Sequence, residues 1–211
     1  MKARVFSSLL PLSCLLLFTL GATASSIPVA NFSFEANNGF NNACGGTCQY
    51  STGLAIPDWN SSGATGQWIV GGFALNPPAF DGSVLAYSNG GSISQDVGTV
   101  AVGPTYTLQV EVLHRTDAPM AGVVQLEVGG VVVATATGPD AGPGTWNNFT
   151  AVYTPTASDA GKTLTILLSA AGAQGDFDDV RLGSTAVPEP MTMLLLGSGL
   201  VLAALKFRRR V

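Results

Sequence analysis

One acidic side chain stands out because the strand that carries it otherwise faces the core. Val180 and Leu182 alternate with polar positions near the end of the chain, and Asp178 lies two residues before Val180. Side chains alternate between the two faces of a strand, so Asp178 is predicted to point inward with them. A carboxylate cannot be buried without partners, and something must compensate Asp178. The neighbouring acids Asp176 and Asp179 are predicted to be solvated.

Aromatic and amide side chains supply a second kind of chemistry. A sugar site needs aromatic faces, since pyranose rings stack their C–H surfaces on them, with amides or carboxylates beside them for the hydroxyl groups. Trp68 and Tyr87 are candidate platforms in the loop-rich first half. Gln109 and Glu111 point outward from one predicted strand and could line a polar face, although such a face is usually only hydrated. Further candidates are Phe73, Phe80, Gln125 and Glu127.

A hydrolytic enzyme would need either a Ser/His/Asp set or two carboxylates across a cleft. Glu111 and Glu127 could oppose each other on adjacent strands, but nothing in their spacing requires it. The only histidine, His114, is expected to end a strand. The sequence therefore predicts a protein without enzymatic activity, and a polysaccharide hydrolase is the weaker alternative.

The elements that position these side chains are predicted to be short β-strands. In residues 106–112, apolar even positions alternate with polar odd ones, as in an antiparallel strand with one buried face. Residues 124–128 repeat the pattern, Gly129-Gly130 supplies the positive φ angles of a tight turn, and residues 131–136 return as the partner strand. Frequent turn residues between short strands predict a two-sheet jelly-roll sandwich. The other predicted strands are 29–34, 67–70, 83–87, 92–97, 146–153, 163–169 and 177–182.

Short motifs spread along nearly the whole body point to a known group of domains. They are Asn31 to Glu35, Pro57-Asp58-Trp59, Asp81-Gly82, Ser94-Gln95-Asp96, Tyr106-Thr107-Leu108, Thr145-Trp146 and Phe177 to Leu182. Together they resemble CenC-type carbohydrate-binding modules, which belong to the galactose-binding-like jelly rolls. The resemblance implies this fold and a carbohydrate ligand, although the group also includes domains that bind no sugar. Trp59 and Trp146 match motif positions that usually pack the core.

The resemblance also implies a metal ion. In these modules a structural calcium lies between the opening Asn-x-x-Phe-Glu segment and the closing aspartate, and the matching residues here are Glu35 and Asp178. Calcium takes hard oxygen ligands from carboxylates and backbone carbonyls, which can gather where two chain ends meet. The alternative is that Asp178 lies at the mouth of its strand and accepts hydrogen bonds from loop amides in water.

The first 24 residues have the pattern of a secretory signal peptide. Lys2 and Arg4 form a short positive region, Leu9 to Leu20 an apolar core, and Ala22-Thr23-Ala24 a small-residue cleavage site. Cleavage is expected after the last of these residues, which leaves a body at residues 25–186.

The last 25 residues combine three features in a fixed order. The motif Val187-Pro188-Glu189-Pro190 precedes an apolar run from Met191 to Leu205, and the cationic cluster Arg208, Arg209 and Arg210 follows. The run can form a short transmembrane helix with the arginines on the cytoplasmic side. This tail at 187–211 resembles the PEP-CTERM sorting signal of Gram-negative bacteria that make extracellular polysaccharide, which an exosortase is thought to recognise and process. On hydropathy alone it could be an ordinary C-terminal anchor.

Charge is distributed unevenly along the chain. Residues 25–186 contain three basic and twelve acidic residues, which gives the body a net charge of −9. Such a body repels phosphate backbones, because nucleic-acid binding needs clustered Lys and Arg side chains. Nucleic acid is therefore excluded as a partner.

Two cysteines lie close together in a loop rich in Asn and Gly. Cys44 and Cys48 enclose Gly45-Gly46-Thr47. In an exported chain the surroundings are oxidising, so the pair is predicted to form a disulfide that pins the loop.

These features predict an exported, non-catalytic protein of a bacterial cell surface or biofilm matrix that binds carbohydrate, such as extracellular polysaccharide. The precursor is expected to be anchored in the inner membrane with its body in the periplasm, and then to be processed and released towards the surface or matrix. A purely structural matrix protein with the same fold and no sugar site is the main alternative.

Overall fold

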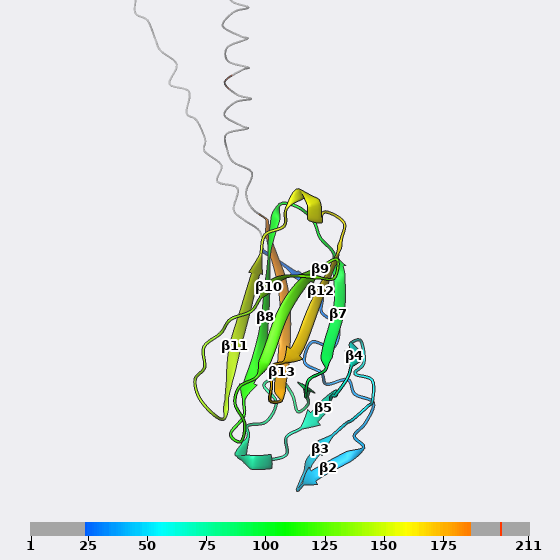
Figure 1. Ribbon diagram of the computed structural model, residues 1–211, viewed down its shortest axis with the longest axis vertical. Coiled ribbons are helices and arrows are strands. Elements are labelled where there is room, and N and C mark those ends of the chain that lie inside the picture. Colours follow the sequence, from blue (N-terminus) through cyan, green and yellow to red (C-terminus); the bar gives the residue numbers. More distant parts are fainter. Residues whose placement is uncertain (1–23, 187–198, 200–211) are drawn as a thin grey trace, which may run out of the picture. The chain divides into compact units, whose positions relative to one another are not determined.

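The computed structural model describes residues 24–186 and residue 199. Residues 24–186 form two β-sheets packed face to face, which confirms the predicted all-β sandwich (Figure 1). The predicted signal helix, the predicted transmembrane helix and the sorting residues Val187 to Pro190 and Arg208 to Arg210 lie outside the described residues. Among the residues described, no helix is long and apolar enough to span a bilayer.

The two sheets differ in size. The larger sheet consists of β1 (Ala24–Ile27), β2 (Asn42–Gly45), β3 (Cys48–Tyr50), β5 (Thr65–Ile69), β6 (Leu85–Ser88), β8 (Pro104–His114), β11 (Thr145–Tyr153) and β13 (Gly175–Ala186). The smaller sheet consists of β4 (Asn60–Ser62), β7 (Ser92–Thr99), β9 (Gly122–Val128), β10 (Val131–Thr135) and β12 (Thr163–Ala170). Two short 3-10 helices, η1 (Phe73–Leu75) and η2 (Ala157–Asp159), lie in connections.

All strand pairs are antiparallel, and β13 organises the larger sheet. The order of that sheet is β11-β8-β13-β6-β5-β3-β2, and that of the smaller sheet is β10-β9-β12-β7-β4. Along one side β13 pairs with β8, and along its other side it pairs first with β6 and then with β1. The first and last described strands therefore lie side by side, with Ala24 opposite Thr185.

The main core fills the space between the sheets. In the middle of β8, β9 and β12 every second residue is apolar and buried, and these side chains point into the core. Its largest fully buried members include Phe34, Leu108, Leu126, Ile166 and Phe177. Trp59 is buried in this core, as its motif position implies.

Most predicted strands are confirmed within a few residues, as is the tight turn at Gly129-Gly130, where φ is 58° and 79°. The strand predicted at 29–34 is wrong. That segment is a turn in which Asn31 and Phe34 have positive φ angles, and its apolar residues pack by side-chain contact, with Phe34 5.2 Å from the ring of Trp59. The short strands β1 to β4 escaped prediction because three or four residues show no alternation.

The prediction that Asp178 points into the core with Val180 is wrong, because β13 contains a bulge. The register to β8 shifts between Asp178 and Arg181, and Asp179 has a φ of 47°. Phe177 and Val180 therefore both face the main core, which alternation alone would forbid. Asp178 lies on the opposite face from Phe177, so its burial was predicted correctly but for the wrong reason. Asp176 and Asp179 are also buried, contrary to prediction.

Candidate functional site

A second apolar cluster lies on the outer face of the larger sheet. Along β6, Ala86 belongs to the main core, whereas its neighbours Leu85 and Tyr87 belong to this outer cluster. Trp68 of β5 joins them. The outer cluster is covered by loops and by the β2–β3 hairpin, since the smaller sheet packs against the other face.

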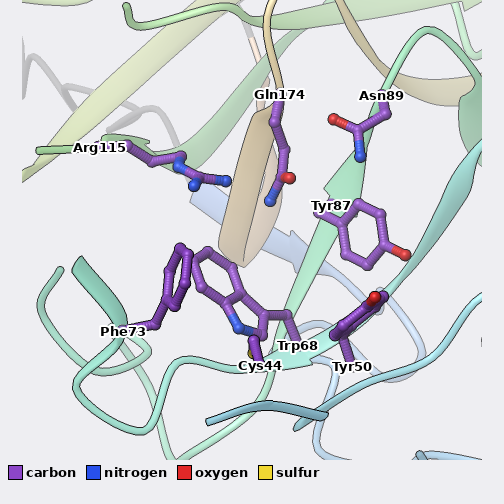
Figure 2. A pocket seen from close by; sticks show the side chains of 8 residues that line it. All are labelled: Cys44, Tyr50, Trp68, Phe73, Tyr87, Asn89, Arg115 and Gln174. Carbon is purple, nitrogen blue, oxygen red and sulfur yellow. The ribbon is translucent and has the colours of Figure 1, made fainter. Parts of the chain in front are cut away.

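The outer cluster surrounds a pocket of about 310 Å³. Figure 2 shows Trp68 and Phe73 forming one aromatic wall and Tyr50 and Tyr87 another. Within each wall the rings pack edge to face, with centroids 6.1 Å apart for Trp68 and Phe73 and 6.5 Å apart for Tyr50 and Tyr87. The polar side chains at the pocket are Asn89, Arg115 and Gln174.

Arg115 is the one cation at this pocket among the residues described. Its guanidinium carbon lies 5.0 Å from the centre of the Trp68 ring, a cation–π contact. Its Nε and Nη2 atoms donate to the two carboxylate oxygens of Asp117 at 2.8 and 2.7 Å. This bidentate pair keeps the guanidinium over the indole and lowers the pKa of Asp117.

Asp176 adjoins the pocket and is fully buried. It pairs across the sheet with Tyr87, and its Oδ1 accepts a hydrogen bond of 2.6 Å from Gln174. Its Oδ2 has no partner, the single case among buried side-chain atoms of the described residues. Burial raises the pKa of Asp176 to about 7, although Gln174 and Arg115 oppose the rise. Near neutral pH this group can therefore be a neutral acid or a carboxylate.

The four predicted sugar-binding residues do not lie together. Trp68 and Tyr87 line the pocket, but they are only 4% and 6% exposed, so they are walls of a cavity and not open platforms. Glu111 is buried and accepts a hydrogen bond of 2.9 Å from Asn148. Gln109 is exposed two residues earlier in β8, outside the pocket.

Glu111 and Glu127 lie in different sheets, so they do not oppose each other as a hydrolytic pair would. Glu111 belongs to β8 of the larger sheet. Glu127 belongs to β9 of the smaller sheet, where it pairs with Val132 and Thr165. Trp146, predicted to be in the core, is only partly buried and packs on the outer cluster, with its indole N–H donating to Pro78.

Glu35 and Asp178 hold one loop from two sides. Oε1 of Glu35 accepts the backbone N–H groups of Ser83 and Val84 at 2.8 and 2.7 Å, and its Oε2 accepts the Ser83 hydroxyl. Asp178 accepts the N–H groups of Asp81 and Asp179 at 2.9 and 2.7 Å. Burial raises the pKa of Asp178 to about 7, although these amide donors oppose the rise. Asp178 therefore accepts hydrogen bonds from loop amides, as the alternative prediction stated, but it is buried and not in water.

The donors around Glu35 and Asp178 compete with a calcium ion for these carboxylates. All four carboxylate oxygens accept an N–H or O–H group, so a calcium ion would have to share or displace these donors. Within residues 24–186, no three His, Cys, Asp or Glu side chains group closely enough to hold a metal. Calcium at these residues stays a prediction that a binding experiment must decide.

The predicted disulfide between Cys44 and Cys48 is present and borders the pocket. It closes the turn of the β2–β3 hairpin, with Cα atoms 5.2 Å apart. Cys44 lines the pocket, and Cys48 is fully buried in the outer cluster.

Sequence reasoning missed several pocket residues. Tyr50 lies in β3 and Asn89 follows β6, two strands too short to show alternation, whereas Arg115 and Gln174 lie in connections just outside the long strands β8 and β13. One available signal pointed to Asp176. The large apolar Phe177 must face the core, which places both its neighbours on the other face.

Two family comparisons match different parts of the chain. The model of the HpiC1-like family, described as HpiC1 cyclase, matches residues 25–183. The chain belongs to the HpiC1-like family. A PEP-CTERM protein-sorting motif matches residues 186–210, which confirms the predicted sorting tail. No curated protein matches the sequence.

Two solved cyclase structures share the fold of this HpiC1-like body, and a xylan-binding domain is more distantly similar. The Stig cyclase Fisc from Fischerella sp. TAU, in complex with (3Z)-3-(1-methyl-2-pyrrolidinylidene)-3H-indole, is 20% identical with a TM-score of 0.63, covering 78% of this chain and 100% of that one. A second cyclase structure from the same organism is 19% identical with a TM-score of 0.63, covering 79% and 100%. The CBM22-1 xylan-binding domain from Paenibacillus barcinonensis Xyn10C is 14% identical with a TM-score of 0.43, covering 74% and 93%.

Proposed function

We propose that this protein is an exported, non-catalytic carbohydrate-binding protein of a Gram-negative cell surface or polysaccharide matrix. The sorting motif at 186–210 supports export and processing by an exosortase. The precursor is held at the inner membrane with its body in the periplasm, and processing then releases it towards the surface. Its ligand is extracellular polysaccharide, bound in the pocket that contains Trp68.

The observation that carries this proposal is the composition of the pocket. Its partly exposed rings, Tyr50 and Phe73, offer faces for the C–H surfaces of a sugar ring. The side chains of Asn89, Arg115 and Gln174 offer hydrogen bonds to its hydroxyl groups. Each of these three groups has donors that fit hydroxyl oxygens. A pocket of this kind recognises a polar ring with apolar faces.

The size of the pocket narrows the ligand to a short glycan segment. About 310 Å³ is near the lower end of the roughly 300–1,000 Å³ that is usual for ligand sites. Trp68 and Tyr87 are almost completely buried, so a long chain cannot lie across their faces. We therefore expect the pocket to take a chain end or a side-branch sugar.

The test compares two Gln→Ala variants in full-length protein. Gln174→Ala removes an amide at the pocket, whereas Gln109→Ala removes an exposed amide of the same sheet outside the pocket. On a column of immobilised extracellular polysaccharide from the producing strain, Gln174→Ala should lose about tenfold in affinity, as loss of one or two hydrogen bonds predicts. Gln109→Ala should be retained like the unchanged protein.

Absence of retention for the unchanged protein, on this column and on a panel of other glycans, would overturn the carbohydrate proposal. It would favour a purely structural matrix protein. Equal losses of affinity in the two variants would mean that the binding site lies outside the pocket.

One observation favours a second function, acid catalysis on an unsaturated ring compound. Asp176 has a buried and unpartnered Oδ2 next to an aromatic pocket, and its pKa of about 7 suits a proton donor at neutral pH. The family is described as a cyclase, and one solved relative holds an indole derivative. Turnover of an indole substrate by the unchanged protein, and its loss in Asp176→Asn, would establish this function in place of non-catalytic binding.

A further inference from the structure

The β2–β3 hairpin forms one side of the pocket and is held to the sandwich mainly at the end of β3, where Ser51 is bonded to Gln67 and Tyr87. It lies at the edge of the larger sheet, and β3 pairs with β5 at only two positions, Gln49 with Ile69 and Tyr50 with Trp68. Figure 1 shows it beyond β5, away from the space between the two sheets. The main core therefore does not hold the hairpin in place.

The disulfide lies between the hairpin and the aromatic wall. Cys44 lines the pocket, and the indole N–H of Trp68 donates a hydrogen bond of 3.2 Å to Sγ of Cys48. That sulfur is thus a direct contact of the residue that forms the pocket wall. Tyr50, two residues beyond Cys48, lines the pocket as well.

The backbone behind Cys48 fits closely against the segment after β5. A Cβ atom added to Gly71 would overlap the backbone of Thr47 and Cys48, so side-chain volume is excluded there. The position of Cys48 is therefore set from two sides, by Gly71 behind it and by the bond to Cys44. Opening the bond removes one of these two constraints.

We infer that the Cys44–Cys48 disulfide is a positioning element for Trp68 and Tyr50, and that the protein binds its ligand only while this bond is closed. This inference rests on the proposed function in the pocket. A dithiol reductant breaks the S–S bond, supplies two electrons and two protons to form two thiols, and is itself oxidised to a disulfide. The hairpin then loses its closed turn, Cys48 moves relative to the indole, and the pocket loses one side.

The consequence is a site that becomes active only after export. Thiols stay reduced in the cytoplasm and form disulfides in the periplasm and beyond. A chain still in the cytoplasm would thus fold its main core without a competent pocket, and oxidation would complete it.

The three tryptophans provide a direct test, because each indole N–H has a different partner. Trp59 donates to the carbonyl of Asn31, Trp146 to that of Pro78, and Trp68 to Cys48. In ¹⁵N-labelled full-length protein in detergent micelles, dithiothreitol should shift the Trp68 indole resonance and leave those of Trp59 and Trp146 in place. Reoxidation should restore the original spectrum.

A Cys44→Ser variant, which keeps the Cys48 sulfur but cannot close the bond, should show the reduced spectrum without any reductant. An unmoved Trp68 resonance in both the reduced protein and the variant would overturn the inference. Loss of all three dispersed resonances would also overturn it, because the disulfide would then hold the whole fold and not one wall.

A retention experiment tests this inference separately from the proposed function. On the immobilised polysaccharide, reduction should weaken retention at least tenfold, and reoxidation should restore it. Unchanged retention after reduction overturns the inference and leaves the carbohydrate proposal intact. If the oxidised protein is not retained at all, the carbohydrate proposal fails, and the Trp68 resonance still decides whether the disulfide positions the wall.

Discussion

The two apolar clusters of this protein are built in different ways. The main core lies between two sheets, and its residues come from alternating positions on several long strands. The outer cluster lies on the far face of the larger sheet, and its cover consists of loops, η1 and a disulfide-closed hairpin. The first arrangement stabilises the fold, and the second leaves a cavity that a ligand can enter.

Buried charge accompanies the outer cluster. Asp176 is fully buried and pairs across the sheet with Tyr87, and the Arg115 guanidinium lies over the Trp68 ring. Burying a carboxylate with an unpartnered oxygen opposes folding. A region that accepts this cost has the character of a functional site.

The largest effect is expected in the main core. Phe177→Ala removes a fully buried ring and should lower the free energy of unfolding by about 3–5 kcal/mol in urea denaturation. Phe32→Ala is the matched control, since Phe32 is 41% exposed and should cost about 1 kcal/mol or less. Equal costs would mean that the sandwich core does not dominate stability.

The second effect is a dependence of stability on pH. Asp176 and Asp178 have pKa values raised to about 7, above the value near 4 of an unfolded chain, so the folded state binds their protons more tightly. Their contribution favours folding below about pH 4, declines as the pH rises to about 7, and is level above that.

The free energy of unfolding should therefore fall by on the order of 2–4 kcal/mol for each group between pH 5 and pH 8. In Asp176→Asn the free energy of unfolding should depend less on pH, because one of the two carboxyl groups is gone. This variant should be more stable than the unchanged protein at pH 8. A flat profile in the unchanged protein, measured by urea denaturation across this range, would contradict the burial of these carboxylates in solution.

A pair of glycine variants sharpens the comparison at the hairpin. Gly71 and Gly72 both have left-handed φ angles, 55° and 78°, so an alanine at either should cost about 1–2 kcal/mol of backbone strain. Only at Gly71 would the added methyl overlap Cys48, whereas Gly72 has open space. Gly71→Ala should therefore weaken ligand retention several-fold beyond Gly72→Ala, and equal retention would show that the hairpin does not shape the pocket.

The smallest effect is expected at the loop held by Glu35. Glu35→Gln leaves one acceptor oxygen and should cost about 1 kcal/mol, because charge-assisted hydrogen bonds to backbone amides are lost. Glu127→Gln, on the solvated side of the smaller sheet, should change stability by less than about 0.5 kcal/mol.

The same loop tests the calcium prediction. With the carboxylates of Glu35 and Asp178 engaged by amides, neither calcium nor EDTA should move the thermal unfolding midpoint. A midpoint that rises with calcium concentration would mean that the carboxylates release the loop amides to bind the ion.

The sequence by itself determined the class of the fold and the sorting motif at the C-terminal end. Alternation in segments such as 106–112 and 163–169 is a local property, so the long strands and their buried faces could be predicted without a structure. The sorting motif and the disulfide were equally readable, because each depends on residues close together in the chain.

Only the tertiary structure decided which side chains share a site. The bulge at Asp179 changes the face of every residue before it in β13, and no periodic pattern announces such a shift. The pocket joins residues from β3, β5, η1, β6 and the ends of β8 and β13, which meet only because the sheet order places them side by side. Strand pairing over long sequence separations is a property of the whole chain. For this reason Trp68 and Tyr87 could be named in advance, whereas Arg115 and Gln174 could not.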